Sequence, residues 1–205
     1  MNVQKIKQQK QIKQFLTEQF GPEKGRVLLE QQQTSLRTLL QNIGDKSPGQ
    51  QRTLAQQILP CIALYQALQN SGLLQKEAYR HTRTYMLKYV AAKQHASTAK
   101  MELVPGFYFL YSAIFRRVMR TSDLWESTQA HSRDSFDITI RACLWHTTCA
   151  EYGCAELCRL FCEADNVTYG GLHKIGFART RTLGCGGDCC DFHFFRKGNT
   201  KADLY

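Results

Sequence analysis

The segment from residue 135 to residue 142 reads SFDITIRA, with an apolar side chain at every second position. Such alternation is typical of a β-strand that buries one face and exposes the other. Residues 175–183 (IGFARTRTL) and 190–195 (CDFHFF) are predicted as two further strands. Residues 184–188 between them (GCGGD) are rich in glycine and suit the turn of a hairpin. We therefore predict a small antiparallel sheet in the C-terminal part of the chain.

Upstream of this sheet the apolar residues follow a helical period, which predicts a layer of helices. The predicted helices upstream of the sheet span residues 3–20, 23–42, 48–71, 74–96 and 107–119. A sixth predicted helix, between the first two predicted strands, spans residues 145–164. Pro60 lies inside the third helix and removes a backbone donor, so we expect a kink or a break there. The predicted fold class is α+β, with an N-terminal helical layer packed on a small antiparallel C-terminal sheet.

A chain of 205 residues is long enough for one sizeable domain and too short for two large ones. We expect a single domain over residues 1–205, made of a polar, basic helical N-terminal extension (1–47), a helical part (48–120) and a cysteine-rich α+β part (121–205). Hydrophobic residues make up 43% of the chain and charged residues 21%, so wholesale disorder is excluded.

The formal net charge of +10 comes entirely from the first half of the chain. Residues 1–100 hold 15 Lys and Arg against 5 Asp and Glu, whereas residues 101–205 hold 12 of each group. No base-stacking or groove-reading motif accompanies this charge, so we interpret the basic, glutamine-rich segments as solvated helix faces and expect no nucleic-acid partner. The charge favours a small anionic substrate as the partner, and the oligomeric state stays open.

The first 20 residues lack the apolar core of a secretory signal. The longest apolar stretches, at 58–68 and 107–115, are shorter than the ~18–20 residues of a membrane span. We therefore expect a cytoplasmic protein without membrane association. Its nine cysteines are then expected to be free, metal-bound or catalytic rather than paired in disulfides.

Eight of the nine cysteines lie between residues 143 and 190. Cys154, Cys158 and Cys162 are four residues apart, which places them on one face of the predicted helix and favours a packing role. The close Cys-x-x-Cys spacing of strong zinc sites is absent, so no cofactor is assigned. The wider pairs Cys158-x3-Cys162 and Cys185-x3-Cys189 keep a metal site open.

The last predicted strand holds a thiol, a carboxylate and an imidazole at Cys190, Asp191 and His193. Strand alternation places Cys190 on one face and the other two on the opposite face, which excludes a Cys190–His193 dyad within the strand. A partner for Cys190 must therefore come from another element. The candidates are Asp165, Cys143 and Cys162.

Asp165 is predicted to end its helix, three residues after Cys162. Arg179 and Arg181 share one face of the strand predicted at 175–183. The forked guanidinium of arginine matches a carboxylate through two hydrogen bonds, so this pair is a candidate clamp for a substrate carboxylate.

Several sequence pieces occur in a fixed order. They are Ile58-Leu59-Pro60, Ile62 to Leu68, Pro105-Gly106-Phe107, Cys143, Gly153 to Leu157, Phe161-Cys162-x-x-Asp165, Arg179-Thr180-x-Thr182-Leu183, Gly186-Gly187 and Cys190-Asp191-Phe192. This ordered set resembles the L-2-amino-thiazoline-4-carboxylic acid hydrolase family over roughly residues 50–196. The resemblance implies a hydrolase that opens a small cyclic amidine-like carboxylate by C–N or C–S hydrolysis, the named family reaction yielding N-carbamoyl-L-cysteine.

The resemblance also implies roles for individual residues. The candidate nucleophiles are Cys190, Cys162 and Cys143, and the candidate general bases or amidinium partners are Asp165 and Asp191. The candidate substrate-binding residues are Arg181, Arg179 and His193, the last of which stands where we expect an arginine in the family pattern. Two other functions stay open: a metal or iron–sulfur protein using Cys143, Cys162 and Cys190, and an inactive small-molecule binding protein on the same scaffold.

Overall fold

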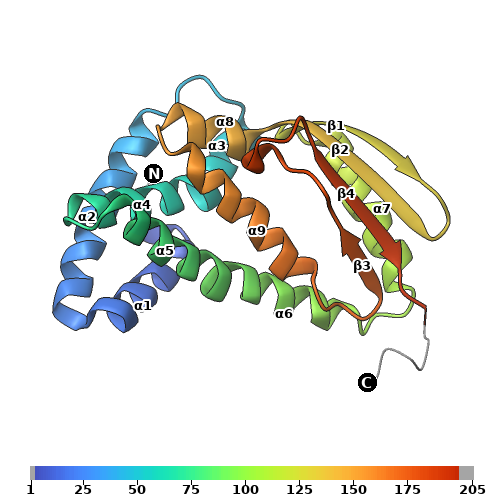
Figure 1. Cartoon of the computed structure of the whole chain (residues 1–205), viewed down its shortest axis with the longest axis horizontal. Coiled ribbons are helices and arrows are strands. Elements are labelled where there is room, and N and C mark those ends of the chain that lie inside the picture. The colour runs from blue at the N-terminus through green and yellow to red at the C-terminus, as the bar shows by residue number, and fades with distance from the viewer. Residues whose placement is uncertain (1–2, 199–205) are drawn as a thin grey trace.

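The computed structural model describes residues 3–198, and its architecture is α+β, which confirms the predicted fold class (Figure 1). The α-helices are α1 (Gln8–Phe20), α2 (Pro22–Gln41), α3 (Pro48–Thr53), α4 (Leu59–Asn70), α5 (Gln75–Tyr85), α6 (Ala92–Met101), α7 (Phe107–Thr121), α8 (Leu144–Glu151) and α9 (Cys158–Tyr169). The strands are β1 (Trp125–His131), β2 (Ser135–Cys143), β3 (Ile175–Ala178) and β4 (Cys190–Arg196). Short 3-10 and π-helical segments complete the order: η1 (Val3–Lys5), η2 (Leu54–Ile58), η3 (Met86–Ala91), η4 (Ala155–Leu157) and η5 (Leu183–Cys185).

The four strands form one antiparallel sheet in the order β1-β2-β4-β3. The two central strands bring their apolar positions opposite each other. The opposed pairs are Phe136 with Phe194, Ile138 with Phe192, and Ile140 with Cys190. Burial alternates along both strands, as the alternating sequence predicts, so one face of the sheet is buried and the other carries the polar residues.

Two features of the sheet differ from the prediction. Strand β1 was not predicted, because as an edge strand it alternates only between half-buried and exposed positions and lacks a strong apolar period. Strand β3 is shorter than predicted and ends at Ala178. It ends there because the next backbone N–H groups, those of Thr180 and Arg181, donate to the carboxylate of Asp191 instead of to a neighbouring strand.

The single helix predicted over 145–164 is wrong. The chain forms α8 and α9 instead, separated by Gly153 and η4. Gly153 has a φ of 66°, a left-handed conformation that glycine adopts without steric cost and that ends a helix. Cys154 therefore lies outside α9, and Asp165 lies within α9 rather than at a helix end.

Pro60 causes a local change of helix type rather than a break. The π-helical segment η2 precedes α4, and Pro60 lies in the first turn of α4. Proline cannot donate to the carbonyl of Gln56, and the side-chain amide of Gln8 donates to the Gln56 and Gln57 carbonyls at 3.1 and 3.2 Å. Gln8 is thus buried and structural, which corrects the expectation that the glutamines form only solvated faces.

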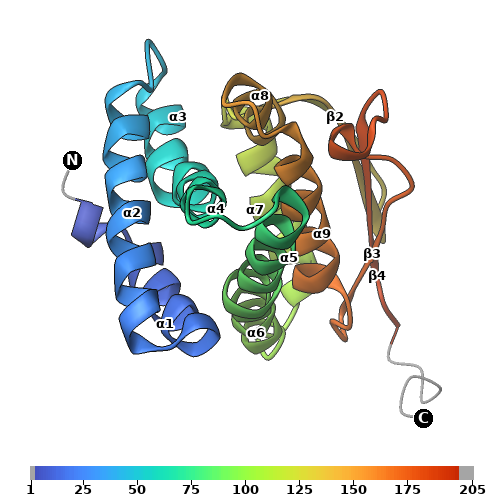
Figure 2. The same cartoon turned by 60° about the vertical axis from the view of Figure 1, so that its left-hand side comes forward.

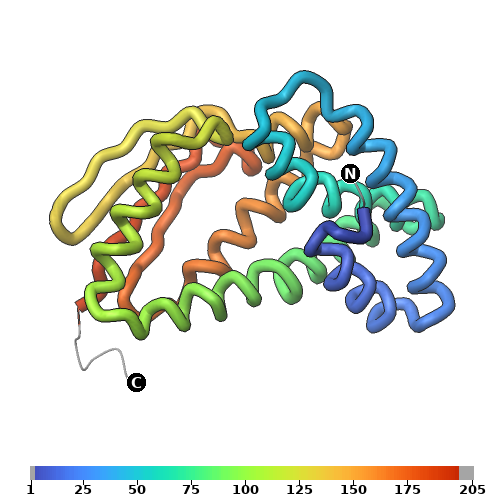
Figure 3. Tube along the Cα trace, turned by 180° about the vertical axis from the view of Figure 1, so that it is seen from behind, coloured from blue at the N-terminus to red at the C-terminus, as the bar shows by residue number. Residues whose placement is uncertain are grey.

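Helix α9 lies between the helical layer and the sheet (Figure 2). One hydrophobic cluster joins α1, α2 and α4 to α8 and α9, so the N-terminal helices contribute to the main core, with Ile12 and Phe15 fully buried. A second cluster joins α7 to the sheet around the stacked rings of Phe136 and Phe194. Figure 3 shows α7 lying against one face of the sheet. Within residues 3–198, no helix has the length and apolar character needed to cross a membrane.

Candidate active site

A cavity of about 180 Å³ lies between α7, α9 and the buried face of β2 and β4. Its walls are mostly apolar, and besides the hydroxyl group of Tyr169 its ionisable groups are thiols and one carboxylate. These groups belong to Cys143, Cys158, Cys162, Cys190 and Asp165. A water molecule occupies about 30 Å³ in the liquid, so this space suits a small organic ring.

Helix α9 supplies three of the polar groups. Cys158, Cys162 and Asp165 are separated by four and three residues, which places all three on the same helix face. Strand β4 supplies Cys190 from its first position, and the buried side of that strand faces the cavity. The fold therefore brings Cys162, Asp165 and Cys190 together from two elements that are separate in the sequence.

Cys143 reaches the same cavity through an irregularity in the sheet. The register of β1 with β2 shifts between Glu126 and Ser127, and β2 carries one more residue than β1 over this stretch. Such a bulge reverses the alternation that follows it, and Cys143 consequently lines the cavity together with Ile140. Burial raises the pKa of the Cys143 thiol to about 11, so this thiol is neutral.

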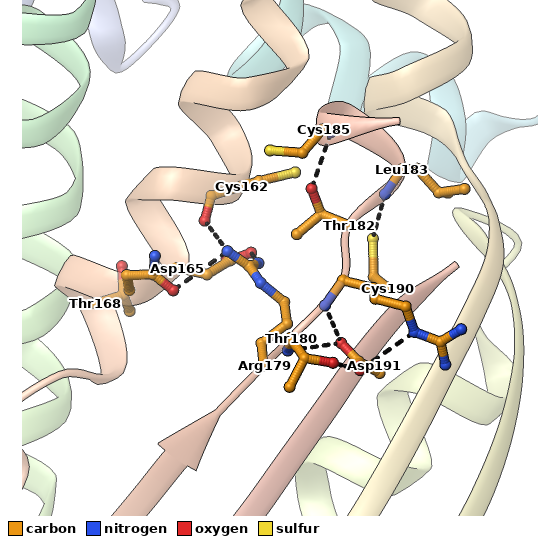
Figure 4. A network of polar contacts seen from close by, with 12 residues as sticks. Cys162, Asp165, Thr168, Arg179, Thr180, Thr182, Leu183, Cys185, Cys190 and Asp191 are labelled. Carbon is orange, nitrogen blue, oxygen red and sulfur yellow. Dashed lines mark hydrogen bonds and ion pairs between the residues drawn. The ribbon is translucent and has the colours of Figure 1, made fainter. Parts of the chain in front are cut away.

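The thiols around Cys162 stabilise a negative charge on its sulfur. Hydrogen bonding with the thiols of Cys158 and Cys190 and with the hydroxyl of Thr182, together with the nearby charge of Arg179, lowers the pKa of Cys162 far below the usual thiol range. The same bonds raise the pKa of Cys158 and of Cys190. Among these three thiols, the negative charge is therefore favoured on Cys162. Figure 4 shows the loop that carries Thr182, where the N–H of Leu183 donates to the Cys190 sulfur and the N–H of Cys185 donates to the Thr182 hydroxyl.

Asp165 has a carboxyl group suited to proton transfer near neutral pH. Burial raises the pKa of Asp165 to about 7, with the charge of Arg179 opposing this rise and that of Cys162 adding to it. Its side chain keeps 34% of its surface accessible and lines the cavity. Both the protonated and the ionised forms are thus available at the same pH, as acid–base catalysis requires.

Arg179 points inward behind the cavity instead of sharing a face with Arg181. Its side chain is 6% exposed, and its guanidinium donates to Asp165 Oδ2 at 3.0 Å and to the Cys162 carbonyl oxygen at 2.8 Å. The guanidinium also lies over the rings of Phe177 and Phe192. The predicted common face is wrong because β3 ends before Arg179, so strand alternation does not apply to it.

Arg181 and Asp191 lie outside the cavity. Arg181 is half exposed and donates to Asp188 at 2.9 Å. Burial opposes ionisation of Asp191, but the hydroxyl of Thr180 and the backbone N–H groups of Arg181 and Thr180 outweigh it and lower the pKa of Asp191 to about 2. Asp191 therefore holds the loop that follows β3.

His193 lies on the exposed face of β4, where its Nδ1 atom is 2.7 Å from Oδ1 of Asp137. The residue at this position points away from the cavity whether it is the histidine present or the arginine expected from the family pattern. Of the predicted substrate-binding residues Arg179, Arg181 and His193, none lines the cavity within the described part of the chain.

The sequence reasoning missed two residues of this site. Thr182 is buried, donates to the Cys162 sulfur and accepts the backbone N–H of Cys185. Gly184 lies so close to the thiols that a Cβ at this position would be 3.0 Å from the sulfurs of Cys158 and Cys162. Thr182 lies in the ordered sequence piece from Arg179 to Leu183, and Gly184 directly follows that piece. This position in the sequence was the signal that could have identified both residues.

The metal alternative gains no support from the geometry. Among the residues that the structure describes, no group of three His, Cys, Asp or Glu side chains is arranged to hold a metal ion. The cysteines proposed for such a centre, Cys143, Cys162 and Cys190, instead form the thiol side of the cavity.

Comparison with known proteins gives one informative match. The family model described as L-2-amino-thiazoline-4-carboxylic acid hydrolase matches residues 51–194, which include every residue that lines the cavity. No curated protein matches the chain. Two solved structures of an Fe(II) unliganded H-NOX protein from K. algicida, one of them a single-residue mutant, align with 10% and 9% identity over 93% of this chain and 95% of theirs. Their TM-scores are 0.32 and 0.28. The chain belongs to the matched family of hydrolases.

Proposed function

We propose that this member of the L-2-amino-thiazoline-4-carboxylic acid hydrolase family uses the Cys162 thiolate to open the ring of a small cyclic amidine. The observation that carries the proposal is that a stabilised thiolate and a carboxyl group with a pKa of about 7 line one cavity, from the same face of α9. A nucleophile beside a titrating acid–base group is the arrangement that covalent hydrolysis requires.

Cys162 is a better nucleophile than the other two candidate cysteines. A thiolate attacks and a neutral thiol does not, and the lowered pKa of Cys162 supports a negative charge on its sulfur. Cys190 donates to that charge, and Cys143 has a raised pKa because it is buried. We assign Cys190 and Cys158 as the donors that hold the thiolate, and Cys162 as the group that attacks.

In the first step the Cys162 sulfur bonds to the ring carbon between nitrogen and sulfur. The electron pair of the carbon–nitrogen double bond moves to nitrogen, which takes the proton of Asp165. The tetrahedral centre then collapses and the bond from this carbon to the ring sulfur breaks. The ring sulfur leaves with the electron pair and takes a proton from the attacked amidine group, so the ring is open and its carbon is bound to Cys162.

In the second step water attacks the carbon bound to Cys162. The ionised carboxylate of Asp165 takes one proton from this water, and the electron pair of the carbon–nitrogen double bond moves to nitrogen. The proton of the new hydroxyl group passes to that nitrogen, the carbon–oxygen double bond forms, and the bond to Cys162 breaks to restore the thiolate. The carbon now carries oxygen and forms a carbamoyl group. The sum of both steps is the addition of one water to the substrate, and Cys162 and Asp165 return to their starting states.

Arg179 acts in this scheme as a positioning residue. It holds the Asp165 carboxylate and the backbone of Cys162 with one guanidinium, which keeps nucleophile and acid–base group at a constant separation. It faces away from the cavity and has no contact with the substrate in this scheme.

The test is the ring opening of 2-aminothiazoline and its 4-carboxylate, followed by mass spectrometry of the product that has gained one water. We expect turnover by the unchanged chain, its loss in Cys162→Ala and in Asp165→Asn, and trapping of a covalent adduct on Cys162 in the acid-quenched reaction. Cys149→Ala, which alters a buried cysteine outside the cavity, is the matched control. Full activity of Cys162→Ala would overturn the proposed nucleophile, and binding without turnover would favour an inactive binding protein on this scaffold.

A further inference from the structure

An open groove of about 740 Å³ lies between three parts of the helical layer: η1 with the start of α1, α3 with η2, and η3 with α6. Among the described residues, none lines both this groove and the thiol cavity. Each of the three walls contributes at least one cation. The cations that line the groove are Lys5, Lys7, Arg52 and Lys93. A hollow surrounded by positive charge attracts anions, so this groove is a candidate binding site.

The positive charge of the groove is not balanced by acids of its own segments. All of the lining residues fall within residues 1–17, 46–76 and 78–101, and these three stretches contain no Asp or Glu. Within residues 3–198, none of the four groove cations forms an ion pair. The excess charge of the first half of the chain is therefore partly gathered around one hollow.

The acids that approach from neighbouring positions are held by other groups. Glu18 accepts from the Tyr89 hydroxyl and lies 3.6 Å from the Lys88 ammonium group. Asp123 accepts from the Ser47 hydroxyl at the start of α3. Neither carboxylate lines the groove, so an incoming anion would not compete with them for the four cations.

Glutamine side chains join the walls of the groove to one another. The amide of Gln8 donates to the carbonyl oxygens of Gln56 and Gln57 at 3.1 and 3.2 Å, which fixes the start of α1 to η2. The amide of Gln11 donates to the Tyr89 carbonyl oxygen at 2.7 Å, which fixes α1 to η3. The groove is thus formed before any ligand arrives, and binding need not order its walls.

The lining residues favour phosphate groups over other anions. Three of the four cations are lysines, which bind phosphate as point charges, whereas a planar carboxylate is matched best by the fork of arginine. A phosphate group also carries about −1.5 to −2 charges, so a few such groups can balance four cations. None of the described lining residues is aromatic, so the groove lacks the stacking surface that a nucleobase uses.

We propose that this groove binds a small polar anion that carries two or more phosphate groups, held by Lys5, Lys7, Arg52 and Lys93. The site is separate from the cavity of the proposed ring opening, and it holds or fails independently of that function. Lys5 and Lys7 lie outside the matched residues 51–194, so the family match does not assign the groove.

The first test is the binding of tripolyphosphate, measured by calorimetry on the full chain at about 0.15 M salt. We expect Arg52→Gln combined with Lys93→Gln to raise Kd at least about tenfold. The matched control combines Arg133→Gln with Lys76→Gln, which removes the same charge from exposed positions on the β1–β2 turn and on α5. We expect the control to change Kd by about twofold or less. An equal rise of Kd in both proteins would overturn the proposal, because binding would then follow net charge alone.

A charge added to the groove provides the second test. Gln57 is exposed and lines the groove, so Gln57→Glu adds a negative charge with little change of shape. Gln31→Glu makes the same change at an exposed position of α2. Tripolyphosphate should raise the unfolding temperature of the unchanged chain and of Gln31→Glu, and should raise that of Gln57→Glu much less. An equal increase in all three proteins would contradict the site.

A ten-nucleotide thymidine strand, titrated in the same way, distinguishes a small anion from a nucleic acid. We expect it to bind more weakly than tripolyphosphate, because the groove has no aromatic residue on which its bases could stack. Tighter binding of the strand, lost in the Arg52 and Lys93 double variant, would overturn the ligand class. Failure of the unchanged chain to bind tripolyphosphate at up to about 1 mM would overturn the site itself.

Discussion

Arg179 Nη1 lies 3.0 Å from Asp165 Oδ2, and this contact joins the loop after β3 to the middle of α9. The Arg179 side chain is nearly inaccessible at 6% exposure, whereas Asp165 also faces the cavity. Burial raises the pKa of Asp165 to about 7 in spite of this neighbour, because the charge of Arg179 only partly offsets the loss of hydration. The contact therefore holds the carboxyl group in position and limits the rise of its pKa.

Replacing Arg179 by methionine should destabilise the chain in a pH-dependent way. Without the guanidinium, the pKa of Asp165 rises further, so an ionised Asp165 becomes more costly at high pH, whereas a protonated Asp165 tolerates the loss at low pH. We expect a loss of about 3 kcal/mol in the free energy of unfolding at pH 9 and a smaller loss at pH 5, measured by urea denaturation. An equal loss at both pH values would show that Arg179 contributes packing alone.

Ring opening should slow as the pH rises through about 7, because Asp165 then loses the proton that it donates in the first step. The measurement is kcat/KM between pH 5 and pH 9 with 2-aminothiazoline. In Arg179→Met the pKa of Asp165 should be higher, so the fall in the residual kcat/KM should occur at a higher pH. Such a shift would assign the fall to Asp165. If kcat/KM fell at the same pH in both proteins, the fall would be assigned to titration of the substrate instead.

Replacing Thr182 by valine should raise the pKa of Cys162, because the hydroxyl group donates to its thiolate. A hydrogen bond to a charged group contributes about 1.5 kcal/mol, which corresponds to a shift of about one pH unit. The measurement is the pH dependence of Cys162 alkylation by iodoacetamide, followed by mass spectrometry. Thr182→Ser keeps the hydroxyl and should retain the original profile, so identical profiles for the valine and serine variants would rule out the hydrogen bond.

Replacing Gly184 by alanine should disturb the thiol cluster more than the fold. The added Cβ would be 3.0 Å from the sulfurs of Cys158 and Cys162, so the loop or the thiols must move. We expect a loss of at least about tenfold in kcat/KM and of about 1–2 kcal/mol in stability. Gly198→Ala is the control, because a Cβ there has no neighbour within 4 Å. Unchanged activity of Gly184→Ala would show that the cluster tolerates displacement.

The local pattern was sufficient for the central strands and for the separation of Cys190 from His193. Side chains alternate along a strand regardless of what surrounds it, and in the structure Cys190 lines the cavity while His193 contacts Asp137 on the opposite face. The family resemblance directed attention to Cys143, Cys162 and Asp165, and the structure places these residues around one cavity with Cys190. The helix boundary at Gly153 was missed because the apolar period continues across it.

The α+β class, the buried faces of β2 and β4, and the helical spacing of Cys158, Cys162 and Asp165 could be predicted from the sequence, because they follow from period and local geometry. The inward direction of Arg179, the bulge that turns Cys143 into the cavity and the lowered pKa of Cys162 are known only from the tertiary structure. These properties depend on strand ends, register and hydrogen bonds between residues distant in the chain. Charge in a cavity is set by all of the elements that line it, and no single segment contains that information.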